Sequence, residues 1–575
     1  MKRYWKYIRP YIQYYILGPG FMMMEVVGDV LLPYMLAKII NQGIAEKNVA
    51  YIIKIGAIMG LISVIMAVGG VLGAWFASKA AMNFGADLRM DLFEKIQQFS
   101  FQNIDNFSTG SLITRLTNDI TQIQNMIMMT LRMCLRSPGI LIGAMVMAFV
   151  ISPKLAAIFI IVLPVLAVLI VVIMRRAFPQ FRTLQEKLDA LNSCIQEGLV
   201  GIRLIKSFVR GDYEEMRFEK RNQQLKEANL TAMKTMLLYT PLMTLALNIT
   251  TVVVVWSGGN MIVAGNMQVG DLTAFTNYIV QIMSSLTMLS IAFLNWARAI
   301  ASFRRVGEVL DEKIDLTDEN AKHKDRAVCE GSVEFQNVSF RYYKNSPEWV
   351  IENISFKLEA GKTLGIIGST GSGKSTLVSM IPRLYDTDEG TVLVDGINVR
   401  DYGLKPLRDG IGMVLQNNTL FSGSITENLK WGDEDADENA VRTAAQNAQA
   451  AGFIDSFKDG YRTRLEQSGN NVSGGQKQRL CIARALLKCP KILILDDSTS
   501  AVDTATERAI REALLHQYRD MTKIIIAQRI RSVMDADEIL VLDNGKTAGF
   551  GTHEQLLADC PVYREIYDVQ NGREE

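Results

Sequence analysis

The residues with the most specific chemistry form a glycine-rich stretch, GSTGSGKST, in the C-terminal half of the chain. It follows the apolar run TLGII and precedes the helix-prone run LVSMI, so it connects a strand to a helix. In such a loop the glycines let backbone amides face phosphate groups, Lys374 reaches the β- and γ-phosphates, and Ser375 ligates Mg²⁺. The sequence therefore predicts a nucleotide site formed by Gly368, Ser369, Thr370, Gly371, Ser372, Gly373, Lys374, Ser375 and Thr376.

A second stretch with chemical potential is ILILDDSTSAVD, residues 492–503, where an apolar run ends in two adjacent aspartates. A buried strand that ends in an acid, downstream of a phosphate loop, usually supplies a second group for the Mg²⁺ site. We assign that role to Asp496. The following position usually handles the attacking water, so the role of Asp497 is the open question.

These motifs lie in only one half of the chain. At 575 residues the chain is long enough for two to four domains. Its 61 basic and 60 acidic residues give no reason to expect a nucleic-acid partner. The first half is strongly apolar, with six runs near the roughly 20 residues that a helix needs to cross a bilayer. They cover about 11–38, 52–79, 134–151, 155–174, 238–263 and 271–297.

Turns and charges predict how these spans are arranged. Ser152, Pro153 and Lys154 predict a tight turn between the third and fourth spans. The long polar connections after the second and fourth spans are rich in basic residues, whereas 39–51 and 259–270 carry little positive charge. By the positive-inside rule, the long loops and both termini are cytoplasmic, and the chain crosses the cytoplasmic membrane several times. The basic start MKRYWKYIRPYIQYY lacks a small-residue cleavage site, so we expect no removed signal peptide.

The second half has a different pattern. Short apolar runs such as TVLVDG, KILILD and KIIIAQ alternate with helical ones, which predicts an α/β domain with a buried sheet. The charged, aperiodic segment 304–330 is typical of a linker. The predicted fold is multidomain: an all-α six-helix transmembrane domain at 1–303, the linker at 304–330, and an α/β P-loop nucleotide-binding domain at 331–575. The six cysteines lack paired metal-ligand spacing and are expected to be reduced thiols.

The segment VSGGQKQR, residues 472–479, distinguishes among classes of NTPase. With it the chain resembles the ATP-binding cassette (ABC) superfamily, and six spans before one nucleotide domain resemble a half-transporter of the exporter branch. In that family this signature segment faces the γ-phosphate held by the other nucleotide domain, as an anion site at a helix N-terminus. The matching positions are Ser473, Gly474, Gly475 and Gln476.

The resemblance implies roles for further residues. Tyr342 resembles the aromatic residue on which adenine stacks, Gln416 the glutamine that contacts Mg²⁺, and Asp503 the aspartate at the contact between nucleotide domains. The segments RLTND at 115–119 and FVRGDYE at 208–214 resemble loops that dock onto nucleotide domains, although a solvated helical face would look similar.

Two positions depart from the family pattern. Asp497 stands where active members have a glutamate that positions or deprotonates the attacking water, and it is one methylene shorter. A misplacement of about 1 Å can lower a rate roughly a hundredfold. Gln528 stands where the family has a histidine that senses the γ-phosphate, and glutamine carries no titrating proton. Both catalytic positions are therefore degenerate, which predicts an ABC-type ATPase with slow hydrolysis at this chain's own site.

An altered site beside an intact phosphate loop and signature resembles the degenerate-site subunit of heterodimeric bacterial multidrug exporters. A second half-transporter chain would supply the glutamate and the histidine. The alternative is a homodimeric lipid or peptide exporter that uses Asp497 as a slower base. ATP would close the nucleotide domains, and alternating access would export hydrophobic or amphipathic compounds, drug-like or lipid. In another class, the chain would be a regulatory subunit that binds ATP and gates its partner without moving substrate.

Polar residues inside the spans are candidates for substrate contact. Glu25 and Asp29 lie four positions apart on one helical face, and intramembrane acids are costly enough to indicate function. They would attract a cationic amphiphile, pair with a partner's basic residue or line a wet cavity. Asn277 and Gln281 would face a central pathway or join helices together. The sequence names neither the compound nor the partner.

Overall fold

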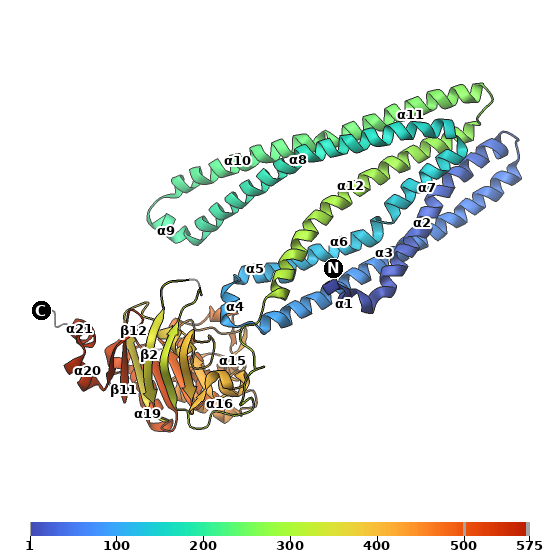
Figure 1. The fold of residues 1–575 in the computed structure, drawn as a ribbon. Coiled ribbons are helices and arrows are strands. Elements are labelled where there is room, and N and C mark those ends of the chain that lie inside the picture. Colours follow the sequence, from blue (N-terminus) through green and yellow to red (C-terminus); the bar gives the residue numbers. More distant parts are fainter. Residues whose placement is uncertain (1, 345, 498–501, 571–575) are drawn as a thin grey trace. The chain divides into compact units, whose positions relative to one another are not determined.

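The computed structural model describes residues 2–344, 346–497 and 502–570, apart from several side chains between 290 and 298. The chain divides into two compact units. The helical unit contains Met1–Gln97 and Gly110–Asp311, and the α/β unit contains Gln98–Thr109 and Glu312–Glu575. Figure 1 shows both units as ribbons.

Eight long helices carry most of the helical unit among the described residues: α2 (Ile12–Lys38), α3 (Val49–Gln97), α6 (Ile120–Met133), α7 (Arg136–Ile151), α8 (Pro153–Val200), α10 (Gly211–Leu237), α11 (Tyr239–Val263) and α12 (Val269–Asp311). Shorter helical segments connect them: η1 (Lys2–Tyr4), α1 (Trp5–Ile8), η2 (Arg9–Tyr11), η3 (Ile39–Ile44), α5 (Thr109–Thr114), η4 (Arg115–Asp119) and α9 (Ile202–Ser207). Because α12 continues to Asp311, the predicted linker at 304–330 begins inside a helix, and the domain boundaries remain a prediction.

The predicted turn at Ser152 is confirmed. The helix α7 ends at Ile151, and α8 begins at Pro153, where the missing N–H of proline costs no helical hydrogen bond. The Ser152 hydroxyl caps α8 by accepting a hydrogen bond from the Leu155 amide at 3.4 Å.

Four helical stretches of the described residues are long and apolar enough to cross a membrane. They are Val49–Gln97, Thr109–Ile151, Pro153–Val200 and Gly211–Val263. They contain the second to fifth predicted spans. The first and sixth predicted spans lie on α2 and α12, which are not among the four, so a total of six crossings remains a prediction.

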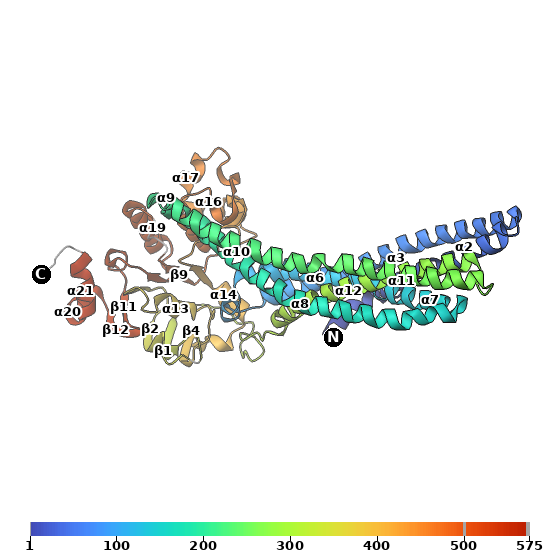
Figure 2. The same ribbon diagram turned by 90° about the horizontal axis from the view of Figure 1, so that it is seen from above.

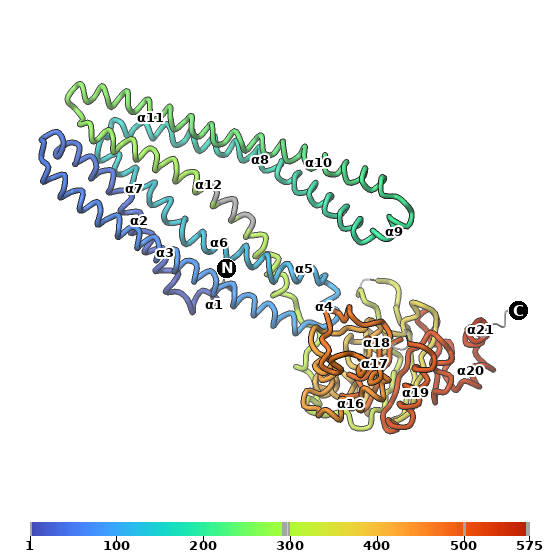
Figure 3. Tube along the Cα trace, turned by 180° about the vertical axis from the view of Figure 1, so that it is seen from behind, coloured from blue at the N-terminus to red at the C-terminus, as the bar shows by residue number. Residues whose placement is uncertain are grey.

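Within the helical unit, α8 runs beside α10 and α11, and the helices meet again at the turn through α9 (Figures 1 and 3). The buried centre of this unit contains small residues such as Ala144, Ala148 and Ala156, which let helices approach closely. The rings of Phe159 in α8 and Phe275 in α12 stack there with centroids 5.4 Å apart. The core therefore joins helices that are distant in sequence.

The α/β unit is built on two main sheets. The larger one has the order β12-β11-β3-β10-β9-β6, with all neighbours parallel except β12. Its strands are β3 (Thr363–Gly368), β6 (Ile411–Val414), β9 (Ile492–Asp496), β10 (Thr522–Ile526), β11 (Glu538–Asp543) and β12 (Lys546–Gly551). The predicted α/β fold with a buried sheet is thus confirmed.

The smaller sheet is antiparallel, with the order β2-β1-β4-β5, and Figure 2 shows β1, β2 and β4 as one layer. Its strands are β1 (Val333–Phe340), β2 (Ile351–Leu358), β4 (Glu389–Val394) and β5 (Ile397–Asn398), and a separate hairpin joins β7 (Gly423–Ser424) to β8 (Arg464–Leu465). The helices of this unit are α4 (Phe101–Asp105), α13 (Lys374–Ser379), α14 (Leu404–Asp409), α15 (Ile425–Leu429), α16 (Glu438–Asn447), α17 (Ala451–Ser456), α18 (Gly474–Leu487), α19 (Thr504–Gln517), α20 (His553–Asp559) and α21 (Pro561–Gln570), with 3₁₀ turns η5 (Val399–Asp401), η6 (Gly460–Arg462), η7 (Gln467–Gly469) and η8 (Ile530–Ser532).

Alternation along β9 divides the core of this unit in two. Ile492 and Ile494 pack with α13 and the antiparallel sheet, whereas Leu493 and Leu495 pack with the helices α15 to α19. A strand buried on both faces shows a continuous apolar run in the sequence, as ILIL does here. The two clusters position different functional segments, because α13 follows the phosphate loop and α18 follows the signature.

The helix α4 belongs to the α/β unit although it is encoded within the membrane half. The Tyr385 hydroxyl donates a hydrogen bond to the Asp105 carboxylate at 2.8 Å, and the rings of Phe101 and Tyr385 lie 5.9 Å apart. Ser100 caps the helix through a reciprocal capping box with Asn103. The docking segment of this long loop is therefore Gln98–Thr109.

The segment 115–119, which resembled a docking loop, lies instead in the helical unit as η4. The carboxylate of Asp119 is nearly inaccessible and accepts hydrogen bonds from Arg305 Nε and Ser302 Oγ, both at 2.8 Å, from α12. The Arg115 guanidinium binds Glu308 of the same helix at 3.1 Å. These polar contacts are long-range, so the sequence pattern alone did not distinguish them from docking contacts.

Candidate nucleotide site at the carboxyl edge of the parallel sheet

The phosphate loop joins the end of β3 to the start of α13. Gly371 and Gly373 have φ angles of 85° and 89°, in the left-handed region that favours glycine. A side chain at Gly373 would also meet Ile351 Cγ2 at 2.6 Å and the Val350 carbonyl oxygen at 2.9 Å. The turn therefore depends on glycine both for its backbone conformation and for space.

Lys374 begins α13 and folds over the loop. Its ammonium donates hydrogen bonds to the carbonyl oxygens of Gly368, at 2.9 Å, and Ser369, at 2.7 Å. Burial lowers the pKa of Lys374, and the nearby charges of Asp496 and Asp497 oppose that shift. A cation held against this loop is suited to bind the phosphate groups of a nucleotide.

The two residues predicted for the Mg²⁺ site are in direct contact. The Ser375 hydroxyl donates a hydrogen bond to Asp496 Oδ1 at 3.0 Å, so a hydroxyl and a carboxylate oxygen lie together at the end of β9. Asp496 is buried, and that burial raises its pKa. Mg²⁺ prefers such oxygen ligands, and the donor set fits the ion.

Asp497 and Gln528 follow the neighbouring strands β9 and β10, where the Asp497 amide bonds the Ile526 carbonyl oxygen at 3.1 Å. The side-chain amide of Gln528 donates to Asp497 Oδ2 at 2.8 Å. Asp497 has a φ of 46°, which is uncommon for a residue with a side chain. Burial raises the pKa of its carboxyl group, and the bond from Gln528 partly opposes that shift. The structure thus joins the two degenerate positions into one pair.

Gln416 and Tyr342 flank this edge. Gln416 is exposed two residues beyond β6, the strand that pairs in parallel with β9. The Tyr342 hydroxyl lies 2.8 Å from Thr376 Oγ1 of α13, and its ring packs edge-on against Phe340. Both residues therefore lie near the loop, in places that suit the predicted contacts with Mg²⁺ and adenine.

The signature segment forms the N-terminus of α18. Ser473 is the N-cap, its hydroxyl accepts from the Gln476 amide at 3.3 Å, and Gln476 Oε1 accepts from the Ser473 amide at 2.9 Å. Gly474 and Gly475 form the first turn and leave its amides uncovered by side chains. A phosphate is favoured at such a helix end.

Asp503 caps α19. Its carboxylate accepts from the Thr506 amide at 3.0 Å and from the Thr506 hydroxyl at 2.8 Å, and these bonds lower its pKa. The residues 498–501 that precede Val502 lie outside the described part of the chain. The predicted contact of Asp503 with a second nucleotide domain remains a prediction.

In the helical unit, the two intramembrane acids share one arginine. Arg136 at the start of α7 binds Glu25 at 2.8 Å and Asp29 at 3.3 Å, both from α2. Of the three interpretations of the acids, the structure favours charge pairing, but with a residue of the same chain. Arg136 was missed because it lies 111 and 107 positions away; its only signal was a basic residue at the edge of an apolar run.

The predicted pathway residues on α12 have two different surroundings. Gln281 donates to the Asp29 carbonyl oxygen at 2.7 Å, beside the acid pair, and its own Oε1 is buried without a partner in the described structure. Tyr278 donates to the Val30 carbonyl oxygen at 2.7 Å and is fully buried. Asn277 is exposed and bonds the Thr273 carbonyl oxygen of its own helix. The polar cluster thus contains Gln281 but not Asn277.

Comparisons with known proteins agree with this arrangement. The family described as ABC transporter transmembrane region matches residues 15–286, and the ABC transporter family matches residues 351–500. The uncharacterized ABC transporter ATP-binding protein YfiB of Bacillus subtilis is 39% identical over 574 residues, covering 100% of this chain and 99% of that protein. YgaD of the same organism, a putative multidrug export ATP-binding/permease protein, is 34% identical and covers 99% of each chain.

A solved structure of a bacterial Atm1-family ABC exporter with ATP bound has the same fold, with a TM-score of 0.79, 24% identity and 98% coverage of both chains. This chain therefore belongs to the ABC transporter family. It is an exporter half-transporter, in which a membrane-spanning helical domain precedes an ATP-binding α/β domain that couples ATPase activity to transport.

Proposed function

We propose that this chain is the slowly hydrolysing subunit of a heterodimeric exporter of hydrophobic or amphipathic compounds. The observation that carries the proposal is the hydrogen bond from Gln528 to Asp497 at 2.8 Å. The amide occupies one oxygen of the shortened carboxylate, and glutamine cannot take a proton from water. The water-handling side of the site thus lacks both the reach of glutamate and the proton chemistry of histidine.

The phosphate side supports firm binding of ATP. Lys374 would pair with the β- and γ-phosphates, Tyr342 would stack on adenine, and Ser375, Gln416 and Asp496 would hold Mg²⁺. A bound Mg²⁺ neutralises the charge that develops on the phosphates. Binding without rapid hydrolysis would make this site a clamp between two nucleotide domains.

A second half-transporter would complete both sites. The amides at Ser473, Gly474 and Gly475 are available at a helix N-terminus for a γ-phosphate held by a partner chain. The turn between α9 and α10 also presents apolar side chains to solvent, with Phe208 70% and Val209 88% exposed. Exposed apolar residues at a turn favour a docking partner, since their burial would remove about 25 cal/mol per Å² of unfavourable contact with water.

The substrate class is supported by charge in the helical unit and by a relative. Glu25, Asp29 and Arg136 together carry one net negative charge, which favours an amphiphile with a cationic group. The relative YgaD carries the name of a putative multidrug exporter. We therefore propose cationic amphiphiles as the first compounds to test.

The test of the degenerate site is to purify the chain alone in detergent and to measure ATP binding, ATP turnover and oligomeric state in the same sample. Tight binding with almost no turnover is expected. Brisk turnover by a self-associated dimer would exclude the heterodimer and make Asp497, whose raised pKa suits a general base, a working catalytic residue.

The test of substrate transport uses the completed pair in vesicles. Glu25→Gln and Asp29→Asn should each lower uptake of a fluorescent cationic amphiphile while ATP turnover is retained, and Asn277→Ala is the matched control outside the polar cluster. A pair whose ATP turnover responds to no amphiphile, and that transports none, would instead support the regulatory subunit.

A further inference from the structure

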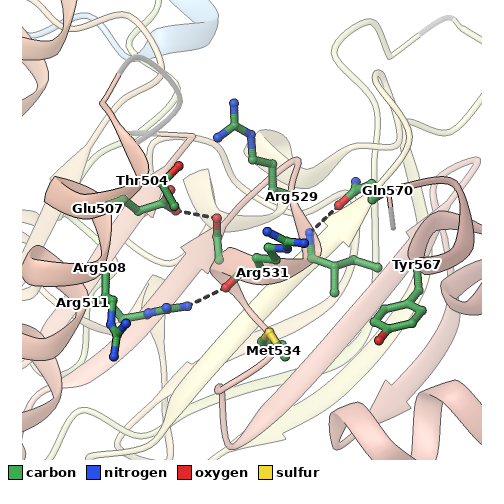
Figure 4. A pocket seen from close by; sticks show the side chains of 11 residues that line it. Thr504, Glu507, Arg508, Arg511, Arg529, Arg531, Met534, Tyr567 and Gln570 are labelled. Atoms are coloured by element: carbon green, nitrogen blue, oxygen red, sulfur yellow. Dashed lines mark hydrogen bonds between the residues drawn. The ribbon is translucent and has the colours of Figure 1, made fainter. Parts of the chain in front are cut away.

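An arginine-rich cavity lies in the α/β unit, apart from the residues assigned to ATP. It has a volume of about 550 Å³ and is bounded by α19, the segment after β10, and α21 (Figure 4). Small-molecule sites in proteins typically have volumes of about 300–1,000 Å³. Four of its lining residues are arginines: Arg508 and Arg511 from α19, and Arg529 and Arg531 from the segment after β10.

The positive charge of this cavity is only weakly compensated. Its single lining acid, Glu507, accepts a hydrogen bond from the Ser532 hydroxyl. Arg508 pairs with Glu512 at 3.0 Å, in a pair whose side chains are 74% and 56% exposed. Exposed pairs contribute about 0–1 kcal/mol, so such an arginine can exchange its carboxylate for a stronger anion.

Arg511 and Arg529 complete the arginine set in different ways. Arg511 holds the Arg531 carbonyl oxygen at 2.5 Å and pairs with Asp535 at 3.3 Å, so it fixes the backbone of the cavity wall. Within the described part of the chain, Arg529 forms no ion pair with a carboxylate. The cavity therefore combines a fixed wall with guanidinium groups available to a ligand.

We propose that this cavity binds a small anion that carries two or more phosphate groups. Guanidinium groups are planar and donate paired hydrogen bonds that match phosphate oxygens. Several such groups around one cavity favour a ligand with more than one phosphate. Met534 and Tyr567, on the other side of the cavity, provide an apolar surface for an organic part of the ligand (Figure 4).

One wall of the cavity is connected to the degenerate pair. Gln570, at the end of α21, donates from Nε2 to the Gln528 carbonyl oxygen at 2.8 Å and accepts at Oε1 from the Ile530 amide at 2.8 Å. Its side-chain amide thus fixes the backbone of the residue whose side chain binds Asp497. A ligand in the cavity would be coupled to the nucleotide site, and such coupling is reciprocal between the two sites.

The binding test uses the full chain in detergent with Lys374→Ala, which weakens the phosphate loop, and inorganic pyrophosphate as the probe in calorimetry. Saturable binding is expected, and Arg508→Gln with Arg531→Gln should weaken it at least about tenfold, because charge-assisted bonds are lost. Arg519→Gln, which removes an exposed charge outside the cavity, should leave it unchanged. No binding at millimolar pyrophosphate, or equal weakening by Arg519→Gln, would overturn the proposal.

The coupling test measures affinity for a fluorescent ATP analogue with and without pyrophosphate, in the chain with Lys374 intact. Direct competition at the phosphate loop persists in the Arg508→Gln/Arg531→Gln variant, so only the difference from the unmodified chain reports the cavity. Gln570→Ala should retain pyrophosphate binding and lose that difference. A difference that survives Gln570→Ala would exclude this route of coupling. Neither test requires hydrolysis, so both are independent of the proposed degenerate function.

Discussion

The two sides of the nucleotide site differ in what they preserve. On the phosphate side, Lys374, Ser375 and Asp496 form a connected set of charged and polar contacts with the residue types expected for binding. On the water side, Asp497 and Gln528 bind each other. The difference separates binding of ATP from its hydrolysis. A ligand that only binds can still shift a conformational equilibrium, provided that its affinity differs between the two states.

The largest expected effect comes from removing the cation of the phosphate side. Lys374→Ala should weaken ATP binding about 100-fold, because at least two charge-assisted hydrogen bonds of roughly 1.5–3 kcal/mol each are lost. Calorimetry with ATP and Mg²⁺ measures the change, and Lys458→Ala, an exposed lysine elsewhere in the unit, is the control. An unchanged affinity would show that the phosphate side is not the binding site.

Restoring the water side should have the next largest effect. Asp497→Glu combined with Gln528→His should raise ATP turnover by about 10- to 100-fold, the range by which general acid–base groups commonly act. Turnover is measured with the complete exporter in detergent, after the partner's own catalytic glutamate has been replaced. Each single substitution should give a smaller gain. No gain from the double variant would indicate that a further feature of the site blocks hydrolysis.

An intermediate effect should come from the signature. Ser473→Ala removes one hydroxyl and the cap of α18, so it should lower turnover at the partner's site by about tenfold, equivalent to about 1.4 kcal/mol. It should not change the affinity of the isolated chain for ATP. If it weakened ATP binding by the isolated chain, the signature would serve this chain's own nucleotide. That result would remove the distinction between lending and receiving a site.

The smallest effect concerns pH. Burial raises the pKa of Asp497 above its unfolded value, so the folded state binds the proton more strongly and stability falls as pH rises through that window. Asp497→Asn should therefore slightly raise the melting temperature of the α/β unit at neutral pH. The gain should vanish near pH 4, where the native carboxyl group is also protonated. Asp503→Asn is the control of opposite sign, since its hydrogen bonds lower the pKa of that carboxyl group.

The parts of this site that the sequence predicts are local. The phosphate loop, the signature helix and the turn at Ser152 each depend on neighbours within a few residues, so glycine spacing and capping residues were sufficient to place them. The alternating β and α runs also predicted the α/β fold, because a parallel sheet covered on both faces leaves continuous apolar strands.

The parts that the sequence did not predict are contacts between distant residues. Arg136 neutralises Glu25 and Asp29 across more than 100 positions, and no local pattern selects one arginine from the many in the chain. The same holds for Gln570, which lies 42 positions beyond Gln528. The pairing of Gln528 with Asp497 followed only from the register of β9 and β10, although both residues had been identified separately.

The placement of α4 has a consequence for how the chain is made. Asp105 is synthesised 280 positions before Tyr385, its hydrogen-bond partner. The α/β unit therefore cannot finish folding from its own contiguous segment, and the early loop must remain accessible beside the ribosome and the insertion machinery until Tyr385 has been translated. A fragment that begins at the predicted boundary of 331 would lack this helix from birth. The order of biosynthesis thus gives a membrane-borne loop the last part in completing a cytoplasmic fold.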